Sequence, residues 1–304
     1  MDTSRLPQRM RERAESVARG QGAWTVPTAR DAATVCLLRD GTDGLEVFLM
    51  RRTTSMAFAA GMHVYPGGAV EASDSAVPIA GRADLAAVAA RTSSDDPHAM
   101  LVAAARETFE ECGVLIALDA DGATAVVDDQ LETERAALDA GEVSFASILE
   151  RRDLRVDDAA IVPFAHWVTP EVEDRRYDTR FFVTVQPEGQ QAVYIAGESD
   201  RSAWWRPGDA VAACVDGRMA MLPPTVATLA QLATYDDAAT AFAAAAMVEV
   251  APILPAPYLQ PDGSVSWHLL HDRTREVLHL GGEPTASETD GVGTQPGPGL
   301  GTAP

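Results

Sequence analysis

Residues 106–113 read Arg-Glu-Thr-Phe-Glu-Glu-Cys-Gly, and this spacing predicts a helix with one acidic face. At about 100° per residue, Glu107, Glu110 and Glu111 fall within about 100° of one another around the helix axis. Mostly apolar and small residues fill the opposite face. Like charges at this spacing weaken a helix by a few tenths of a kcal/mol, roughly, so the arrangement favours a compensating cation.

The three glutamates are also a set of hard oxygen donors. Such donors suit a divalent ion such as Mg²⁺ or Mn²⁺, which prefers oxygen ligands and retains several waters. Arg106 lies beside them, and its planar fork can hold a carboxylate in position. The alternative is a solvent-exposed acidic helix face, which is what most clusters of glutamate form.

A glycine corner precedes this helix. Tyr65-Pro66-Gly67-Gly68 follows a predicted strand at residues 62–65, and Asp74 stands six positions after Gly68. Because glycine carries no Cβ and tolerates positive φ, a Gly-Gly pair lets the backbone approach another element or a ligand closely.

Both halves together resemble the Nudix box, the signature of the Nudix hydrolase superfamily. The matching positions are Gly68, Asp74, Arg106, Glu107, Glu110, Glu111 and Gly113. The sequence departs from the family in two ways: an aspartate stands where a glutamate is usual, and residues 75–105 replace a much shorter spacer. We expect residues 75–97 to form a surface excursion that leaves Asp74 close to Arg106.

The order of the flanking motifs is similar to the Nudix branch that includes the peroxisomal coenzyme A diphosphatase of animals. The motifs are Arg51–Phe58, Trp167–Pro170, Arg176–Phe182, Trp204–Pro207 and Leu222–Thr225. The resemblance implies an α+β protein with the Nudix fold, a mixed β-sheet sandwiched between α-helices, here with helical insertions. Layers built from separate strand and helix segments agree with that class.

The resemblance also implies a function. It is the metal-dependent hydrolysis of a pyrophosphate linkage in a nucleoside-diphosphate-linked substrate, with coenzyme A or acyl-coenzyme A as the leading candidate. Residues 56–68 do not reproduce the fuller coenzyme A signature of some relatives. ADP-ribose, a dinucleotide or a nucleotide sugar therefore remains an alternative substrate, and a non-catalytic nucleotide sensor or regulator is an alternative of another class.

The implied site has three parts. Glu107, Glu110, Glu111 and the backbone of Gly68 would hold Mg²⁺ or Mn²⁺; Glu110, Glu111, Arg106 and a later acid, Glu198, would serve catalysis; Arg176, Arg180 and Trp205 would bind substrate. Glu171, Glu173 and Asp174 compete with Glu198. Exposed arginines, loop acids and core tryptophans are the ordinary alternatives for these positions.

Composition limits the partners. The chain has 304 residues and a formal charge of −21, which argues against a nucleic-acid backbone or an anionic membrane as partner. A small nucleotide-type substrate is expected, and bound cations would reverse the local field. The three cysteines form no close pair, and the N-terminal residues lack an apolar signal segment, so a cytoplasmic protein is expected. The sequence is compatible with a homodimer.

We expect an N-terminal lead (1–24), a single Nudix domain (25–282) and a disordered tail (283–304). The domain carries the box insertion at about 75–97 and a helical insertion at about 122–157. The elements expected within it are a hairpin (32–39 with 45–51), strands at 161–168 and 180–186, helices at 223–235 and 236–247, and a last hairpin (264–270 with 276–280). Asp96, Pro97 and Gly113 have the residue types that cap, begin and end the box helix.

Overall fold

Strand β1 (Arg30–Gly41) lies at the centre of the sheet, because its side chains are buried on both faces. Ala33, Val35 and Leu37 face one apolar cluster, whereas Cys36 and Leu38 face another. The computed structural model describes residues 8–21, 24–53, 59–195 and 199–272. Within them, β1 and β2 (Gly44–Arg52) form the predicted hairpin.

The main sheet has nine strands among the described residues. Its order is β11 (Val265–His271), β10 (Pro252–Leu259), β7 (Val162–Val168), β8 (Tyr177–Val185), β1, β2 and β3 (His63–Val64), with β4 (Gly67–Ala69) paired to β1 and β9 (Ser199–Trp205) paired to β2. β1 pairs with β8, and β10 with β7, in parallel; the other pairs are antiparallel. The mixed sheet confirms the predicted α+β class.

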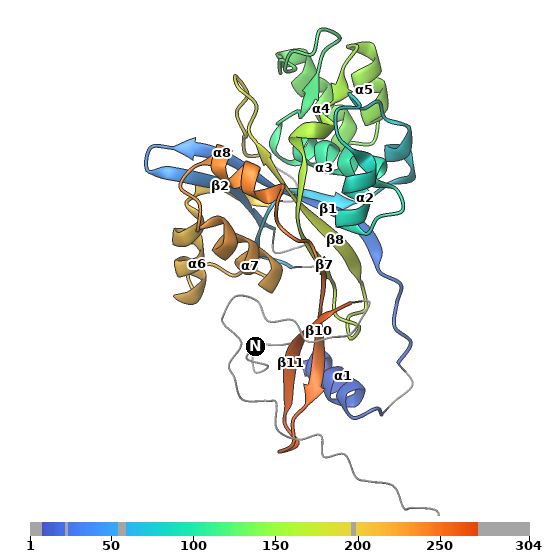
Figure 1. Cartoon of the computed structure of the whole chain (residues 1–304), viewed down its shortest axis with the longest axis vertical. Helices are drawn as coiled ribbons and strands as arrows, with labels where there is room; N and C mark the ends of the chain where they lie inside the picture. The colour runs from blue at the N-terminus through green and yellow to red at the C-terminus, as the bar shows by residue number, and fades with distance from the viewer. Residues whose placement is uncertain (1–7, 22–23, 54–58, 196–198, 273–304) are drawn as a thin grey trace, which may run out of the picture.

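Helices cover both faces of this sheet (Figure 1). One layer holds α2 (Leu85–Thr92), α3 (Pro97–Cys112), α4 (Asp129–Asp139) and α5 (Phe145–Arg151), and the other holds α6 (Pro207–Val215), α7 (Pro223–Leu232) and α8 (Ala238–Ala245). α1 (Gln8–Ala18) packs against the hairpin of β10 and β11. Short elements complete the chain: η2 (Ala72–Ala76), η3 (Asp158–Ala160) and the pair β5 (Ala117–Leu118) with β6 (Arg155–Val156).

Helix α3 carries the acidic motif and begins and ends as predicted. The Asp96 side chain accepts the N–H of Ala99 at 2.9 Å, and Pro97 occupies the first turn. Gly113 ends the helix in the left-handed region, with φ 73°. Residues 100–105 are almost fully buried, because the helix runs between the sheet and the helical insertion.

Three residues of the box insertion are buried, so this segment is anchored in the core although most of residues 75–97 lies at or near the surface. Val77 and Val88 are buried in the same apolar cluster as α3. Thr92 is fully buried, and its hydroxyl donates to the Val88 carbonyl at 2.7 Å. Arg91 donates to the carbonyls of residues 163, 245 and 248, and this ties the insertion to β7 and the α8 region.

The last predicted hairpin is described only in its first strand. Strand β11 pairs with β10, with Leu254 opposite Leu270, and residues 276–280 lie outside the described part of the chain. The sequence interpretation missed β10 because Pro252, Pro255 and Pro257 argue against a strand. It missed β9 as well, whereas α4 and α5 form the predicted helical insertion.

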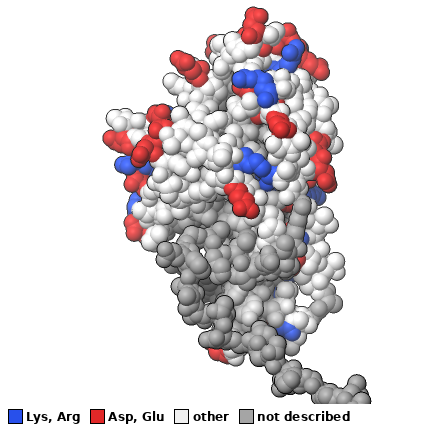
Figure 2. Space-filling model, in the orientation of Figure 1, with Lys and Arg blue, Asp and Glu red and all other residues white. Residues whose placement is uncertain are grey.

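The surface offers no extended cationic area on the face drawn in Figure 2, where the described basic side chains are interspersed with acidic ones. No helix in the described ranges is long and apolar enough to cross a membrane.

Candidate active site

A buried ion pair joins the two halves of the motif. Arg106 donates from Nε to Asp74 Oδ1 at 2.9 Å and from Nη2 to Asp74 Oδ2 at 3.0 Å. Arg106 is 5% exposed and Asp74 1% exposed. The same Nη2 donates to the Ala69 carbonyl at 3.0 Å, so one guanidinium fixes both the corner and η2 against α3. This two-pronged geometry is the kind that makes Arg–carboxylate pairs specific.

Glu107 packs directly against the glycine corner. Its Oε1 accepts from Arg106 Nη1 at 2.7 Å, and the residue is only 9% exposed. A Cβ added at Gly68 would lie 2.4 Å from Glu107 Oε1, so the backbone there is as close to the carboxylate as a glycine allows. The close approach expected of Gly68 is therefore a feature of the structure.

Glu111 contacts the other glycine of the corner. Its Oε2 accepts the backbone N–H of Gly67 at 2.7 Å. Gly67 has φ 157°, and a Cβ at this position would lie 2.5 Å from the Ala33 carbonyl oxygen. The φ value and the close approach to Ala33 both require glycine at position 67. The backbone N–H of Gly67 can therefore lie against α3 as a donor.

Glu110 lies between these contacts, with Oε1 3.6 Å from Arg106 Nη1. Burial raises the pKa of Glu110 to about 7; the charges of Glu107 and Glu71 add to the rise, and Arg106 opposes it. The acidic side of α3 is thus a partly buried, charge-crowded surface and not a solvated helix face. Glu71 stands inside the motif but is not among the site residues predicted from the sequence.

These carboxylates fit a divalent cation by their chemistry. Glu107, Glu110 and Glu111 supply hard oxygen donors, and together with Glu71 they exceed the positive charge that Arg106 provides. Gly68 leaves room beside them that a Cβ would fill. No group of three histidine, cysteine, aspartate or glutamate side chains within the described ranges is already arranged to hold an ion. Arg106 and the Gly67 N–H occupy oxygens of Glu107 and Glu111 in this arrangement.

The two arginines predicted to bind substrate already bind protein oxygens. Arg180 is 3% exposed, donates to the carbonyls of Thr92, Ser93 and Asp178, and pairs with the carboxylates of Asp31 and Asp178. Arg176 donates to the carbonyls of residues 169 and 27. These contacts argue against a phosphate-binding role for either, because their donors already bind protein oxygens.

The aromatic pair on β9 divides between the two faces of the sheet. Trp205 is half-buried and packs with the cluster beneath α6, α7 and α8. Trp204 faces the α3 side, where it contacts Phe48 edge-on at 5.3 Å and lies under the Arg39 guanidinium at 4.2 Å. The structure therefore does not bring Trp205 to the carboxylates.

The predicted later acid, Glu198, lies outside the described residues. Its three competitors are placed at α1 and not at α3. Asp174 pairs with Arg13 at 2.9 Å, and the Glu171 carbonyl accepts from Trp24 Nε1 at 2.7 Å. Burial, with the neighbouring Asp174, raises the pKa of Glu173.

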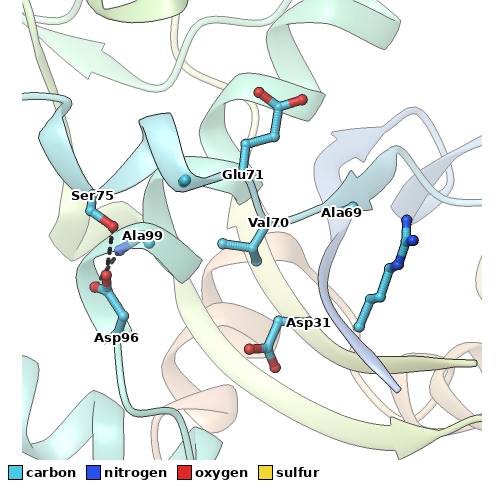
Figure 3. A pocket seen from close by; sticks show the side chains of 9 residues that line it. Asp31, Ala69, Val70, Glu71, Ser75, Asp96 and Ala99 are labelled. Carbon is cyan, nitrogen blue, oxygen red and sulfur yellow. Dashed lines mark hydrogen bonds between the residues drawn. The ribbon is translucent and has the colours of Figure 1, made fainter. Parts of the chain in front are cut away.

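An open hollow lies beside the residues that follow the glycine corner (Figure 3). It lies between the start of β1, the residues after the corner and the first turn of α3, and it is lined by Arg30, Asp31, Ala69, Val70, Glu71, Ala72, Ser75, Asp96 and Ala99. Glu71 is common to the hollow and to the crowded charges around Glu110.

Known proteins share these features. A family model described as the NUDT19 Nudix domain matches residues 88–232. The putative nudix hydrolase 7 of Caenorhabditis elegans is 24% identical over 208 residues, covering 68% of this chain and 62% of that protein. The crystal structure of a NUDIX hydrolase from Alicyclobacillus acidocaldarius has a TM-score of 0.62 and 28% identity, covering 72% of this chain and 97% of that one.

A mixed sheet between two helical layers, with a glutamate-bearing helix held against a Gly-Gly corner, defines the class of protein. The likenesses agree with that definition, and the match to the Alicyclobacillus structure covers 97% of that chain. The matched proteins are Nudix hydrolases, and this chain resembles them in sequence over residues 88–232 and in fold. It spans 62% of the length of its worm relative.

Proposed function

We propose that the protein is a Nudix diphosphohydrolase that uses a divalent cation to cleave a pyrophosphate linkage in a nucleoside-diphosphate-linked small molecule. The observation that carries the proposal is the Arg106–Asp74 pair, which holds the α3 carboxylates against Gly67 and Gly68. No other feature of the described core explains why these charged side chains gather beside two glycines.

The residues divide the chemistry between them. Glu107, Glu110 and Glu111, with backbone near Gly68, would hold Mg²⁺ or Mn²⁺. The bound ion would lower the pKa of an attacking water and stabilise charge on the leaving oxygen. Arg106 orients Glu107 through the 2.7 Å contact to Oε1. Glu110 and Glu111 are the candidates for accepting the proton of the attacking water.

The leading substrate is coenzyme A or acyl-coenzyme A, which rests on the resemblance of the flanking motifs to the coenzyme A diphosphatase branch. ADP-ribose, a dinucleotide or a nucleotide sugar is the rival. Because Arg176 and Arg180 bind protein oxygens, we look for phosphate recognition at other cations, such as Arg30 in the hollow. The unpaired cysteines, with Cys36 and Cys112 buried, support a reducing compartment such as the cytoplasm.

The test is chromatographic detection of the two phosphorylated products formed by hydrolysis of coenzyme A, ADP-ribose, NADH and diadenosine polyphosphates, with Mg²⁺ or Mn²⁺ and with chelator. We expect cation-dependent hydrolysis of at least one compound, and coenzyme A to have the highest kcat/KM. A preference for ADP-ribose would favour the rival substrate. Tight nucleotide binding without turnover of any compound would favour a sensor.

A further inference from the structure

The helical insertion reaches the carboxylate-bearing end of α3 through Arg135. Arg135 belongs to α4, and its Nη1 donates to the Glu110 carbonyl at 3.1 Å. Its Nε donates to Glu132 Oε2 at 3.0 Å, which fixes the direction of the side chain. The Arg135 side chain is 11% exposed, so most of it is shielded from solvent.

This contact satisfies one of the carbonyls that the end of a helix leaves without an intrahelical partner. The Gly113 N–H donates to the Phe109 carbonyl and the Val193 N–H to the Cys112 carbonyl, both at 3.0 Å. Arg135 serves the Glu110 carbonyl between them. It also brings a positive charge to the negative end of the helix dipole, where cations are favourable.

We propose that Arg135 is a positioning residue for the cation site, through which the helical insertion fixes the last turn of α3. The inference rests on the proposed function, because it assigns Glu110 and Glu111 to the cation. Arg135 holds the main chain of Glu110, and the two carboxylates project from the turn that it holds. Without this contact the turn frays, and the carboxylates lose the fixed geometry that a divalent ion needs.

A second arginine of the insertion separates this role from ordinary stabilisation of the insertion. Arg151 lies on the next inserted helix, α5, and donates to Glu134 at 2.9 Å within the insertion. No described contact of Arg151 reaches α3. Replacing Arg151 therefore loses an arginine from the same insertion without releasing α3, and this makes it the matched control.

The experiment compares Arg135→Gln, Arg135→Lys and Arg151→Gln with the wild type. Mn²⁺ affinity is measured by electron paramagnetic resonance on the full chain, and hydrogen exchange is followed at residues 110–113 in chelator. Groups that orient metal ligands typically change metal affinity ~10- to 100-fold. We expect Arg135→Gln to weaken Mn²⁺ binding about 10-fold or more, to speed exchange of the last turn, and to lower kcat with KM for the organic substrate unchanged.

Arg135→Lys keeps the charge and one donor, so its Mn²⁺ affinity should fall between wild type and Arg135→Gln. Arg151→Gln should match the wild type. Unchanged Mn²⁺ affinity in Arg135→Gln, or an equal loss in Arg151→Gln, overturns the proposal. If Arg135→Gln does not fold, Arg135→Lys decides alone: a several-fold loss supports the proposal, and wild-type affinity overturns it.

The two hypotheses can fail separately. A wild type that binds Mn²⁺ through Arg135-dependent geometry, yet hydrolyses nothing in the panel, contradicts the enzymatic function and supports the positioning role. If the wild type hydrolyses its substrate but Arg135→Gln leaves Mn²⁺ binding unchanged, the enzymatic function is supported and the positioning role is contradicted.

Discussion

Asp74 accepts two hydrogen bonds from Arg106 although 32 positions separate them, and both side chains are almost completely buried. The pair closes the chain around the box insertion and connects the glycine corner to the acidic helix. The contribution of the Arg106–Asp74 pair to stability and function can therefore be tested separately from that of the carboxylates that face the proposed cation.

Asp74→Asn should destabilise the protein strongly, because it removes the carboxylate that binds the buried Arg106 guanidinium through two hydrogen bonds. Breaking one side of a buried pair usually costs about 3–5 kcal/mol of unfolding free energy, which urea titration will measure. Asp216→Asn is the control, since the Asp216–Arg218 pair is mostly exposed and such pairs contribute little. Equal losses in the two variants would show that burial does not set the strength of the Asp74 pair.

Glu111→Gln should remove most turnover and leave the fold intact. The amide oxygen can still accept from the Gly67 N–H at the position that Glu111 Oε2 now occupies, 2.7 Å away. Removing one group that stabilises transition-state charge costs at least ~100-fold in kcat. Mg²⁺ should raise the melting temperature of the wild type more than that of the variant, because ligand binding stabilises the folded state. A variant that keeps a tenth of the wild-type rate would exclude Glu111 from catalysis.

Replacing each of the two corner glycines with alanine should have a different effect, on stability at Gly67 and on cation binding at Gly68. At Gly67 the new Cβ would meet the Ala33 backbone oxygen at 2.5 Å with φ 157°, so Gly67→Ala should lower the melting temperature markedly. At Gly68 it would meet the Glu107 carboxylate at 2.4 Å, which can move. Gly68→Ala should therefore fold but bind Mn²⁺ weakly. Gly208→Ala, whose nearest contact is 3.9 Å away, is the control for both measurements.

The metal-free protein should lose stability as the pH rises past Glu110. Burial, with Glu107 and Glu71, raises the pKa of Glu110 from 4.5 to about 7 in the folded state. The folded state therefore binds this proton more tightly, so its stabilising contribution is fully present below pH 4.5 and is lost as the pH rises through 7. In chelator, the melting temperature of the wild type should fall over this window relative to Glu110→Gln. Parallel curves for the two proteins would contradict the assignment.

Replacing residues 76–95 by a short Gly-Ser linker should destabilise the protein, contrary to the expectation for a surface loop. A longer or shorter loop changes closure entropy only slightly. The replacement removes the buried side chains of Val77, Val88 and Thr92 and the Arg91 contacts to three carbonyls. Urea unfolding should show the loss, whereas replacing the exposed residues 120–123 should change stability little.

The box helix could be predicted because its signals are local. Asp96, Pro97 and Gly113 mark its ends, and the spacing of the glutamates reports a helical period. The contact of Asp74 with Arg106 followed from the resemblance, which supplied the long-range information that one sequence lacks.

The contacts of Arg176 and Arg180 and the presence of strand β10 could not be predicted, because they depend on segments that are distant in the sequence. Arg180 is buried by contacts to the box insertion and to Asp31, which nothing near it in sequence reports. Pro255 and Pro257 are two residues apart and leave the same edge of β10 without donors. The missing donors on that edge are tolerated because β7 pairs with β10 only at Pro252 and Ile253.

The parallel pairing of β1 with β8 bears on how the chain matures on the ribosome. Asp31 and Arg180 meet across 149 positions, so β1 lacks its second neighbour until most of the domain has been synthesised. The box helix emerges from the ribosome before β8. Until β8 is synthesised, the sheet that covers the apolar side of this helix stays incomplete. Pairings between such distant segments form slowly, and aggregation competes with folding while apolar surface is exposed. Nascent chains halted before β8 should therefore be the ones that chaperones retain.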